Sequence, residues 1–309
     1  SMRAGASVKL SGGSWLSVSP SGGGNTPATL AVSIVTSGLA VGTYSGTITV
    51  AAPQAANTPQ VVNVSLTVSA ATAPLVTAVV NGASWLAGPI SPGEVLTIGG
   101  TTVGPDTLTK YQLDANGKFP TKLADTAFYF DNIAAPIIYV SRTQSSVIVP
   151  YGIYGRTEVQ LEVEYKGVRS DVIKLKVADG APGVFSTSAN GIGQGAILNQ
   201  DYSINGAANA AARNSVVMIY ATGEGQTSPP GADGTLVGAT LPQSIQRPTV
   251  TIGGKAAEVQ YSGGAPGNVA GLWQINAKVP ADAATGGAVP VVVTIGGVSS
   301  QSTITMAVK

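Results

Sequence analysis

The chain repeats one long segment, and this repeat constrains its architecture more than any other feature of the sequence. Residues 144–177 read QSSVIVPYGIYGRTEVQLEVEYKGVRSDVIKLKV, and residues 274–307 read QINAKVPADAATGGAVPVVVTIGGVSSQSTITMA. A constant offset of 130 residues, without a gap, aligns Pro150 with Pro280, Gly167 with Gly297 and Ser170 with Ser300. A repeat of this length indicates one structural unit that the chain uses twice.

The repeated segment has the pattern of β-strands. In the first copy Val159, Leu161, Val163 and Tyr165 fall on one face, and charged or amide side chains alternate with them on the other. The sequence holds 40 glycines and 19 prolines and only 10% charged residues, which suits strands joined by tight turns. We therefore predict an all-β fold of three immunoglobulin-like β-sandwich domains in series, with boundaries at 1–70, 71–182 and 183–309.

The composition excludes several kinds of chemistry. The sequence contains neither cysteine nor histidine, which rules out thiolate or imidazole zinc sites, a Ser-His-Asp triad and a cysteine nucleophile. A net charge of +1 gives no electrostatic footprint for nucleic acid, and no apolar run reaches the ~20 residues that span a bilayer. We expect no catalytic residues, no cofactor, no metal, no nucleic-acid partner and no membrane insertion, and we expect a monomer.

Residues 8–69 carry the segments WLSVSPSGGG, LAVGTYSGTITV and VVNVSLTV, in which apolar and small polar residues alternate between turns. These segments resemble BACON-type immunoglobulin-like domains, and the resemblance implies carbohydrate binding. Trp15, at the start of the first segment, is a candidate sugar-stacking ring. The alternative, which an aromatic residue beside a tight turn favours, is that Trp15 packs into the small core of this domain.

The remaining two domains resemble IPT/TIG-like immunoglobulin folds. More specifically, residues 75–309 resemble the C-terminal domain family of Solibacter-type acidobacterial surface proteins, through NGASWLAGPISPGEVLTI, GQGAILNQDYSINGAANAAARNS and GGAPGNVAGLWQINAKVP. Trp85 stands where the family pattern has phenylalanine. The resemblance implies an exported bacterial protein, extracellular or at the cell surface, and no particular activity. No signal peptide is visible, but the opening Ser1-Met2 looks like a cloning remnant, so this absence carries no information.

Two acidic features invite a calcium interpretation. Glu158, Glu162 and Glu164 form a row on one strand, but a strand spreads them too far apart to converge on one ion, so a solvated outer face is favoured. The segment Asp201-x-Ser203-x-Asn205-Gly206 matches the first half of an EF-hand loop. Its twelfth position, where the motif needs a bidentate glutamate, is Ala212, so we favour a simple Asp/Asn turn.

Three functions remain open. The first is a non-enzymatic structural or adhesive surface module, and the second is glycan binding, with an extracellular glycan or a surface protein as partner. The ligand-binding candidates are Tyr111 and Phe119, both in a long polar segment from Gly99 to Thr126, together with Trp15. The corresponding loop Glu224–Arg247 contains no aromatic residue, so a shared site is not expected. The third function is a carboxylate-based hydrolase, which no motif supports.

Two expectations concern packing in the repeated domains. Trp273 stands directly before the second copy, where strand alternation favours a place in the core or in a seam between domains. The short connector Ala181-Pro182-Gly183 leaves little slack, so we expect the two repeats to pack rigidly on each other.

Overall fold

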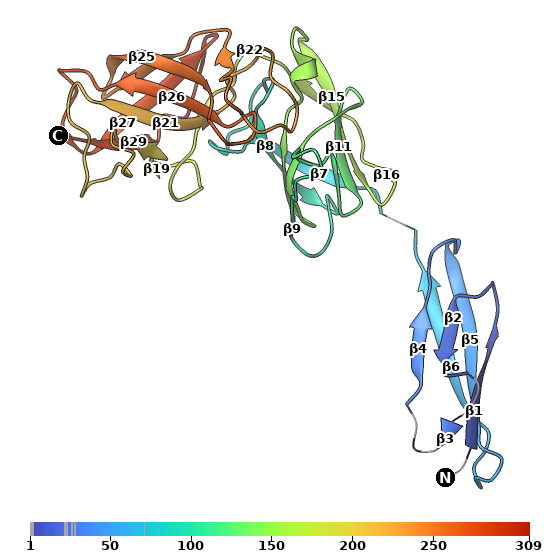
Figure 1. Ribbon diagram of the computed structural model, residues 1–309. Coiled ribbons are helices and arrows are strands. Elements are labelled where there is room, and N and C mark those ends of the chain that lie inside the picture. The colour runs from blue at the N-terminus through green and yellow to red at the C-terminus, as the bar shows by residue number, and fades with distance from the viewer. Residues whose placement is uncertain (1–2, 22–23, 26, 28, 71) are drawn as a thin grey trace. The chain divides into compact units, whose positions relative to one another are not determined.

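The computed structural model describes residues 3–21, 24–25, 27, 29–70 and 72–309 (Figure 1). The chain forms two compact units, Ser1–Ala71 and Thr72–Lys309. In the described part of the chain, strands account for every regular element except one 3-10 turn, η1, at Tyr151–Ile153. The predicted all-β fold of immunoglobulin-like sandwiches is confirmed. The predicted limits of three separate domains are not tested by this division and stay a prediction.

The N-terminal unit contains a four-stranded sheet in the order β3-β1-β5-β6 and a two-stranded sheet of β2 and β4. The strands are β1 (Arg3–Leu10), β2 (Leu16–Ser19), β3 (Gly24–Asn25), β4 (Ala31–Ile34), β5 (Gly42–Ala51) and β6 (Gln60–Val68). Among the residues of this unit whose burial is described, the buried apolar cluster consists of Trp15, Leu16, Val18 and Ile48. Along β6, Val64, Leu66 and Val68 are half-buried, whereas Val62 is exposed.

The first sandwich of the second unit packs a five-stranded sheet, β7-β8-β14-β13-β9, against a sheet built on β10-β11-β15-β16, with β12 and β17 added to β11 and β15. Its strands are β7 (Leu75–Asn81), β8 (Val95–Thr101), β9 (Thr109–Lys110), β10 (Lys122–Leu123), β11 (Thr126–Phe130), β12 (Ile133–Ala134), β13 (Ile137–Val140), β14 (Gln144–Ile148), β15 (Glu158–Tyr165), β16 (Val168–Arg169) and β17 (Ile173–Lys176). The long polar segment 99–126 thus contains two short strands that its composition hides.

The second sandwich is one continuous sheet with the main path β18-β21-β26-β25-β24-β27-β29-β19, which folds onto itself around a single core. Its strands are β18 (Gly183–Val184), β19 (Gly193–Gln194), β20 (Ile197–Leu198), β21 (Val216–Thr222), β22 (Thr227–Ser228), β23 (Gln243–Ser244), β24 (Thr249–Ile252), β25 (Lys255–Gly264), β26 (Trp273–Lys278), β27 (Gly286–Ile295), β28 (Val298–Ser299) and β29 (Ile304–Val308). Trp273 is fully buried in this core, as expected.

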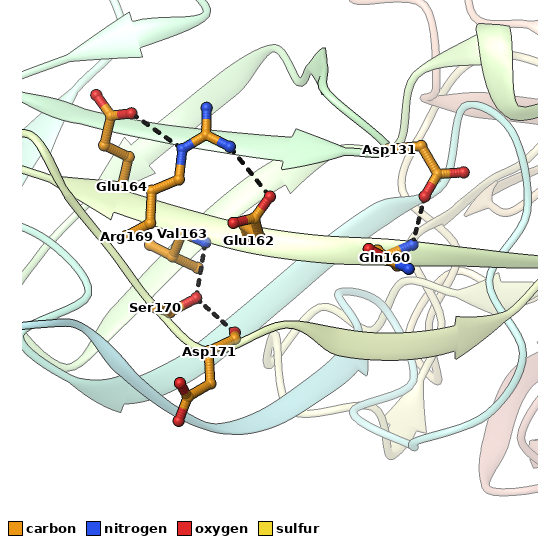
Figure 2. Close-up of polar contacts among 8 residues, drawn as sticks. All are labelled: Asp131, Gln160, Glu162, Val163, Glu164, Arg169, Ser170 and Asp171. Carbon is orange, nitrogen blue, oxygen red and sulfur yellow. Dashed lines mark hydrogen bonds and ion pairs between the residues drawn. The ribbon is translucent and has the colours of Figure 1, made fainter.

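The sequence repeat is reproduced in individual hydrogen bonds. In the first copy the Ser170 hydroxyl accepts the N–H of Val163 at 3.0 Å and donates to Asp171 O at 2.9 Å (Figure 2). In the second copy, 130 residues later, Ser300 accepts the N–H of Val293 at 3.1 Å and donates to the backbone of the next residue. Both serines are buried. At the end of each hairpin, the serine hydroxyl takes the place of a backbone carbonyl as the acceptor for the strand N–H. The alignment by sequence is therefore also an alignment of hydrogen bonds.

The connector between the two sandwiches is held by a buried side-chain amide. Asn81, at the end of β7, donates from Nδ2 to Ala181 O at 3.1 Å and to Glu94 Oε1 at 2.9 Å. Gly183 lies so close that a methyl group built on it would be 2.1 Å from Asn81 Oδ1. The Ala181 N–H in turn donates to Gly223 O at 2.9 Å. The connector thus bonds to the first sandwich on one side and to the second on the other.

Across the same junction the two sandwiches meet backbone to backbone. The Thr222 hydroxyl accepts the Val95 N–H at 2.7 Å and donates to Gly271 O at 2.9 Å, which joins the start of β8 to the end of β21. Methyl groups built at Gly223, Gly225 and Gly271 would approach backbone oxygens to 1.9, 1.8 and 2.4 Å. Only glycine leaves room for these approaches. We call Gly183, Gly223, Gly225 and Gly271 the junction glycines.

Candidate functional site

The candidate site is an open groove at the edge of the five-stranded sheet in the first sandwich. It has a volume of about 700 Å³ and lies along β9, β13 and the start of β14. Its lining consists of Leu108, Lys110, Tyr111, Ile138, Tyr139, Ser141, Thr143 and Gln144. Aromatic and aliphatic surface is combined here with amide, hydroxyl and ammonium groups, a composition typical of sites that hold a polar ligand with an apolar face.

The aromatic part of the groove is a stacked pair. The rings of Tyr111 and Phe119 have centroids 3.9 Å apart and are inclined by 25°. Phe119 is only 6% exposed, whereas Tyr111 is 39% exposed. The Phe119 N–H donates to Gly234 O of the second sandwich at 2.8 Å, and this bond holds the Phe119 backbone in place. Phe119 therefore supports Tyr111 from below, and Tyr111 offers its ring to solvent at little cost in entropy.

The polar part of the groove is organised by strand register. Lys110 on β9 lies directly opposite Tyr139 on β13, so both side chains point from the same face of the sheet. The Gln144 amide donates to the Tyr139 hydroxyl, whose own hydrogen is left to donate. The Ser141 hydroxyl bonds to the Gln144 backbone and closes the turn between β13 and β14. Beside the aromatic pair the Lys110 ammonium and the Tyr139 hydroxyl can donate to a ligand, and the Gln144 side-chain oxygen can accept.

Two of the three predicted ligand-binding residues do not offer a ring to a ligand. Trp15 is only 1% exposed, packs edge-on against Tyr44 and donates from Nε1 to Ser11 O at 3.0 Å. The prediction of a sugar-stacking ring at Trp15 is wrong, because both ring faces are taken up by the core. Phe119 is likewise buried and acts only as the support of Tyr111. Of the three, Tyr111 alone has the predicted exposure. The groove residues Lys110, Tyr139 and Gln144 were not predicted as ligand-binding residues.

The two long loops of the repeats are brought together, although the second contributes no aromatic ring. Besides the bond between Phe119 and Gly234, the Tyr151 N–H donates to Asp233 Oδ1 at 2.8 Å. A methyl group built on Gly231 would lie 2.3 Å from the Tyr151 ring. The second loop therefore contacts the first loop at Phe119 and the η1 turn at Tyr151, and the sequence offers no sign of these contacts between residues more than 80 positions apart.

The row of glutamates on β15 is neutralised by neighbouring cations. Figure 2 shows Arg169 between Glu162 and Glu164, with nitrogen–oxygen distances of 3.0 and 3.4 Å. The Arg169 guanidinium also lies over the Tyr129 ring, 4.4 Å from its centroid. Lys174 pairs with Glu158 at 3.4 Å. These carboxylates face outward and are engaged by arginine and lysine, which fits the solvated face that the sequence analysis favoured over calcium.

The segment at Asp201 is a turn that closes on itself. Asp201 Oδ1 accepts the N–H of Ser203 at 3.0 Å and also its hydroxyl, and these bonds lower the pKa of Asp201. The amide of Asn205 is buried and bonds to Asn199 and to the backbone of Ala307. Across the described residues no group of three or more acidic side chains is placed to hold a metal ion.

Two carboxyl groups are buried at the junction without a cation. Burial raises the pKa of Glu94 to about 8, although hydrogen bonds from the Ser91 N–H and the Asn81 amide oppose the shift. Burial also raises the pKa of Glu224 to about 8, and only the Ser244 hydroxyl, at 3.2 Å, opposes it. Glu224 Oε1 has no hydrogen-bond partner among the described residues. Each acid is the sole charged residue in a stretch of more than ten residues, a signal from which their burial could have been predicted.

Comparisons with known proteins give distant likenesses only. No family model matches the chain, and no curated protein matches it. A Bacteroides ovatus mixed-linkage glucan utilization locus protein, SGBP-B, solved with a mixed-linkage heptasaccharide, is 12% identical, with a TM-score of 0.32 over 99% of this chain and 60% of its own. SGBP-B from a complex xyloglucan utilization locus in Bacteroides uniformis is 12% identical, with a TM-score of 0.22 over 74% and 48%.

A third solved structure is of another kind. The endo-fucoidan hydrolase MfFcnA4, from glycoside hydrolase family 107, is 12% identical, with a TM-score of 0.19 over 98% of this chain and 38% of its own. The chain thus spans 60% or less of the length of each of these proteins. At such scores the likenesses carry no argument about the ligand or the activity of this chain. In the part of the chain that the structure describes, no helix has the length and apolar character to cross a membrane.

Proposed function

We propose that the chain is a non-enzymatic module of an exported bacterial surface protein, and that residues 72–309 act as a rigid two-sandwich scaffold in it. The observation that carries this proposal is the junction, where Thr222 joins β8 to β21 and the junction glycines admit backbone contacts that no larger residue would allow. Such close contacts leave little room for the two sandwiches to shift against each other, which supports one fixed orientation.

The setting of this scaffold follows from the resemblances. The BACON-type, IPT/TIG-like and Solibacter-type patterns imply an exported protein at the cell surface or outside the cell. The groove beside Tyr111 supports the non-enzymatic part of the proposal, because no carboxylate lines it and it offers no acid–base pair for glycoside hydrolysis. In this proposal the N-terminal unit is a separate immunoglobulin-like domain that is not part of the rigid scaffold.

Rigidity of the scaffold is tested by backbone NMR relaxation on the full chain. We expect amides of 72–182 and of 183–309 to report the same rotational correlation time, because the two sandwiches tumble as one body. Small-angle scattering should likewise fit a single conformation for these residues. Distinct correlation times for the two sandwiches would contradict the scaffold proposal.

Glycan binding is the second candidate function, and one observation favours it. Tyr111 is exposed, is supported from below by a buried ring, and borders a groove with amide, hydroxyl and ammonium groups. The apolar face of a pyranose can stack on such a ring while its hydroxyls bond to the polar side chains. In this reading the rigid scaffold holds a glycan-binding groove at a fixed place on the protein.

A pull-down and glycan-array assay on the purified chain tests this function. We expect Tyr111→Ala to weaken binding by roughly tenfold or more, because the mutation removes the stacking surface. Tyr154→Ala is the matched control, since Tyr154 is a half-exposed tyrosine of the same sandwich that lies outside the groove. Equal binding by wild type and Tyr111→Ala would contradict a site at this groove.

A further inference from the structure

We propose that the groove beside Tyr111 binds an anionic glycan, with Lys110 contacting its carboxylate or sulfate groups. This inference rests on the proposal that the groove binds glycans, and it adds the chemical class of the ligand. Three features of the groove carry it: the charge of the lining, the lack of an ion-pair partner for Lys110 among the described residues, and the lack of a carboxylate that would accept from sugar hydroxyls.

The lining of the groove has one charged side chain. Lys110 carries it, and the other seven lining residues are neutral or apolar. Among the described residues no carboxylate lies within 4.0 Å of the Lys110 ammonium, whereas nearby Arg142 is engaged by Asp106 at 2.9 Å. An ammonium group at the edge of an aromatic platform, with no carboxylate in the lining, attracts an anionic group of a ligand.

The position of Lys110 suits a ligand that stacks on Tyr111. Lys110 directly precedes Tyr111 in the chain and lies opposite Tyr139 across β9 and β13. All three residues line the same groove, so a sugar ring stacked on Tyr111 shares this groove with the Lys110 ammonium and the Tyr139 hydroxyl. Substituents on the ring are the groups that these donors can contact.

The hydrogen-bonding balance of the groove favours acceptor-rich ligands. The Lys110 ammonium only donates, the Tyr139 hydroxyl accepts from Gln144 and is left to donate, and the Ser141 hydroxyl is occupied by the Gln144 backbone. Sites for neutral sugars also need strong acceptors for the sugar hydroxyls, and carboxylates usually supply them. This lining has no carboxylate, and its side-chain acceptors are the neutral oxygens of Gln144 and Thr143, so a carboxylate or sulfate ester fits it better than a neutral sugar.

The test compares each acidic polymer with its own neutral form, using the full chain. Isothermal titration is run with polygalacturonate and its carboxyl-reduced product, and with a sulfated galactan and its desulfated product. We expect at least one acidic polymer to bind about fivefold or more tightly than its neutral partner. The pair that shows the preference identifies the group as carboxylate or sulfate. Added salt should weaken the preference.

Two lysine variants assign the preference to the groove. Lys110→Gln should abolish the difference between acidic and neutral polymers, while Lys122→Gln, an equal change of charge on β10 of the other sheet, should leave it intact. Equal or tighter binding of the neutral forms would overturn the inference and leave glycan binding standing. A preference that survives in Lys110→Gln would also overturn it. Binding of neither form would overturn both the inference and the glycan-binding proposal.

Discussion

Replacing Gly223 with alanine is expected to lower the free energy of unfolding of the 72–309 unit by about 3 kcal/mol or more. Gly223 has φ of +83°, which alanine rarely adopts, and an added methyl group would lie 1.9 Å from Ala181 O. The same oxygen accepts the Asn81 amide, so relief of the clash breaks the bond that holds the connector. Urea unfolding followed by tryptophan fluorescence measures the loss.

Gly297→Ala is the matched control for this prediction. Gly297 also has φ of +83°, but an added methyl group meets no atom within 4 Å. Its substitution should therefore cost only the conformational penalty of a left-handed residue, about 1 kcal/mol. In Gly223→Ala we also expect the two sandwiches to lose their common correlation time. If both variants are destabilised equally, the close packing at the junction contributes nothing.

The second large effect is a loss of stability as the pH rises from about 4.5 to about 8. Glu224 has an ordinary pKa of 4.5 in the unfolded chain and one of about 8 in the folded chain, so the folded state binds the extra proton between these values. The stabilisation is fully present below pH 4.5 and is lost as the pH rises through 8. Each such group changes the free energy of unfolding by about 1.4 kcal/mol per pH unit in that window. Glu94, whose pKa is also raised to about 8 by burial, contributes a further loss of stability over the same pH range.

Glu224→Gln should remove part of this dependence. The amide keeps an acceptor for the Ser244 hydroxyl but cannot ionise, so the variant should be more stable than wild type at pH 8 and close to it at pH 5. Burial raises the pKa of Tyr151 and of Tyr261, and the charge on Glu224 raises it further, so both phenols stay neutral in this range. Thermal unfolding across this pH range gives the comparison, and Glu258→Gln, an exposed carboxyl of β25, should follow wild type. A Glu224→Gln curve parallel to wild type would refute the burial argument.

Local patterns in the sequence predicted the parts of the fold that depend on local geometry. The offset of 130 residues places Ser170 and Ser300 at the same hydrogen bond, and the alternation on β15 gives the buried face correctly. β1 was not predicted, because RAGASVKL mixes small, charged and apolar residues without a period of two. Short strands such as β9 were also hidden, since their pairing partner, not their composition, makes them strands.

The candidate site was predicted only in part, because it is assembled by contacts distant in sequence. Tyr111 was found as an exposed aromatic in a polar loop, but the burial of Phe119 depends on Gly234, which lies 115 positions further along the chain. Lys110 and Tyr139 are neighbours only through strand register. Trp15 illustrates the reverse error, since an aromatic beside a turn has the same sequence signature whether its ring is in the core or in solvent.

The contact between the two sandwiches combines side-chain bonds, such as those of Asn81 and Thr222, with close approaches of the main chain, and this has a consequence for how the protein tolerates sequence drift. Carbonyl and amide groups are the same in every residue, so exchange of side chains that make no bond across the seam leaves the main-chain approaches unaltered. The junction glycines are the exception, because any replacement adds atoms where none fit. A saturation mutagenesis map of this region should therefore show intolerance at Gly183, Gly223, Gly225 and Gly271, and at the bonded residues Asn81 and Thr222, set among permissive exposed neighbours. Relatives that keep the seam would share these glycines even where little else of the sequence survives.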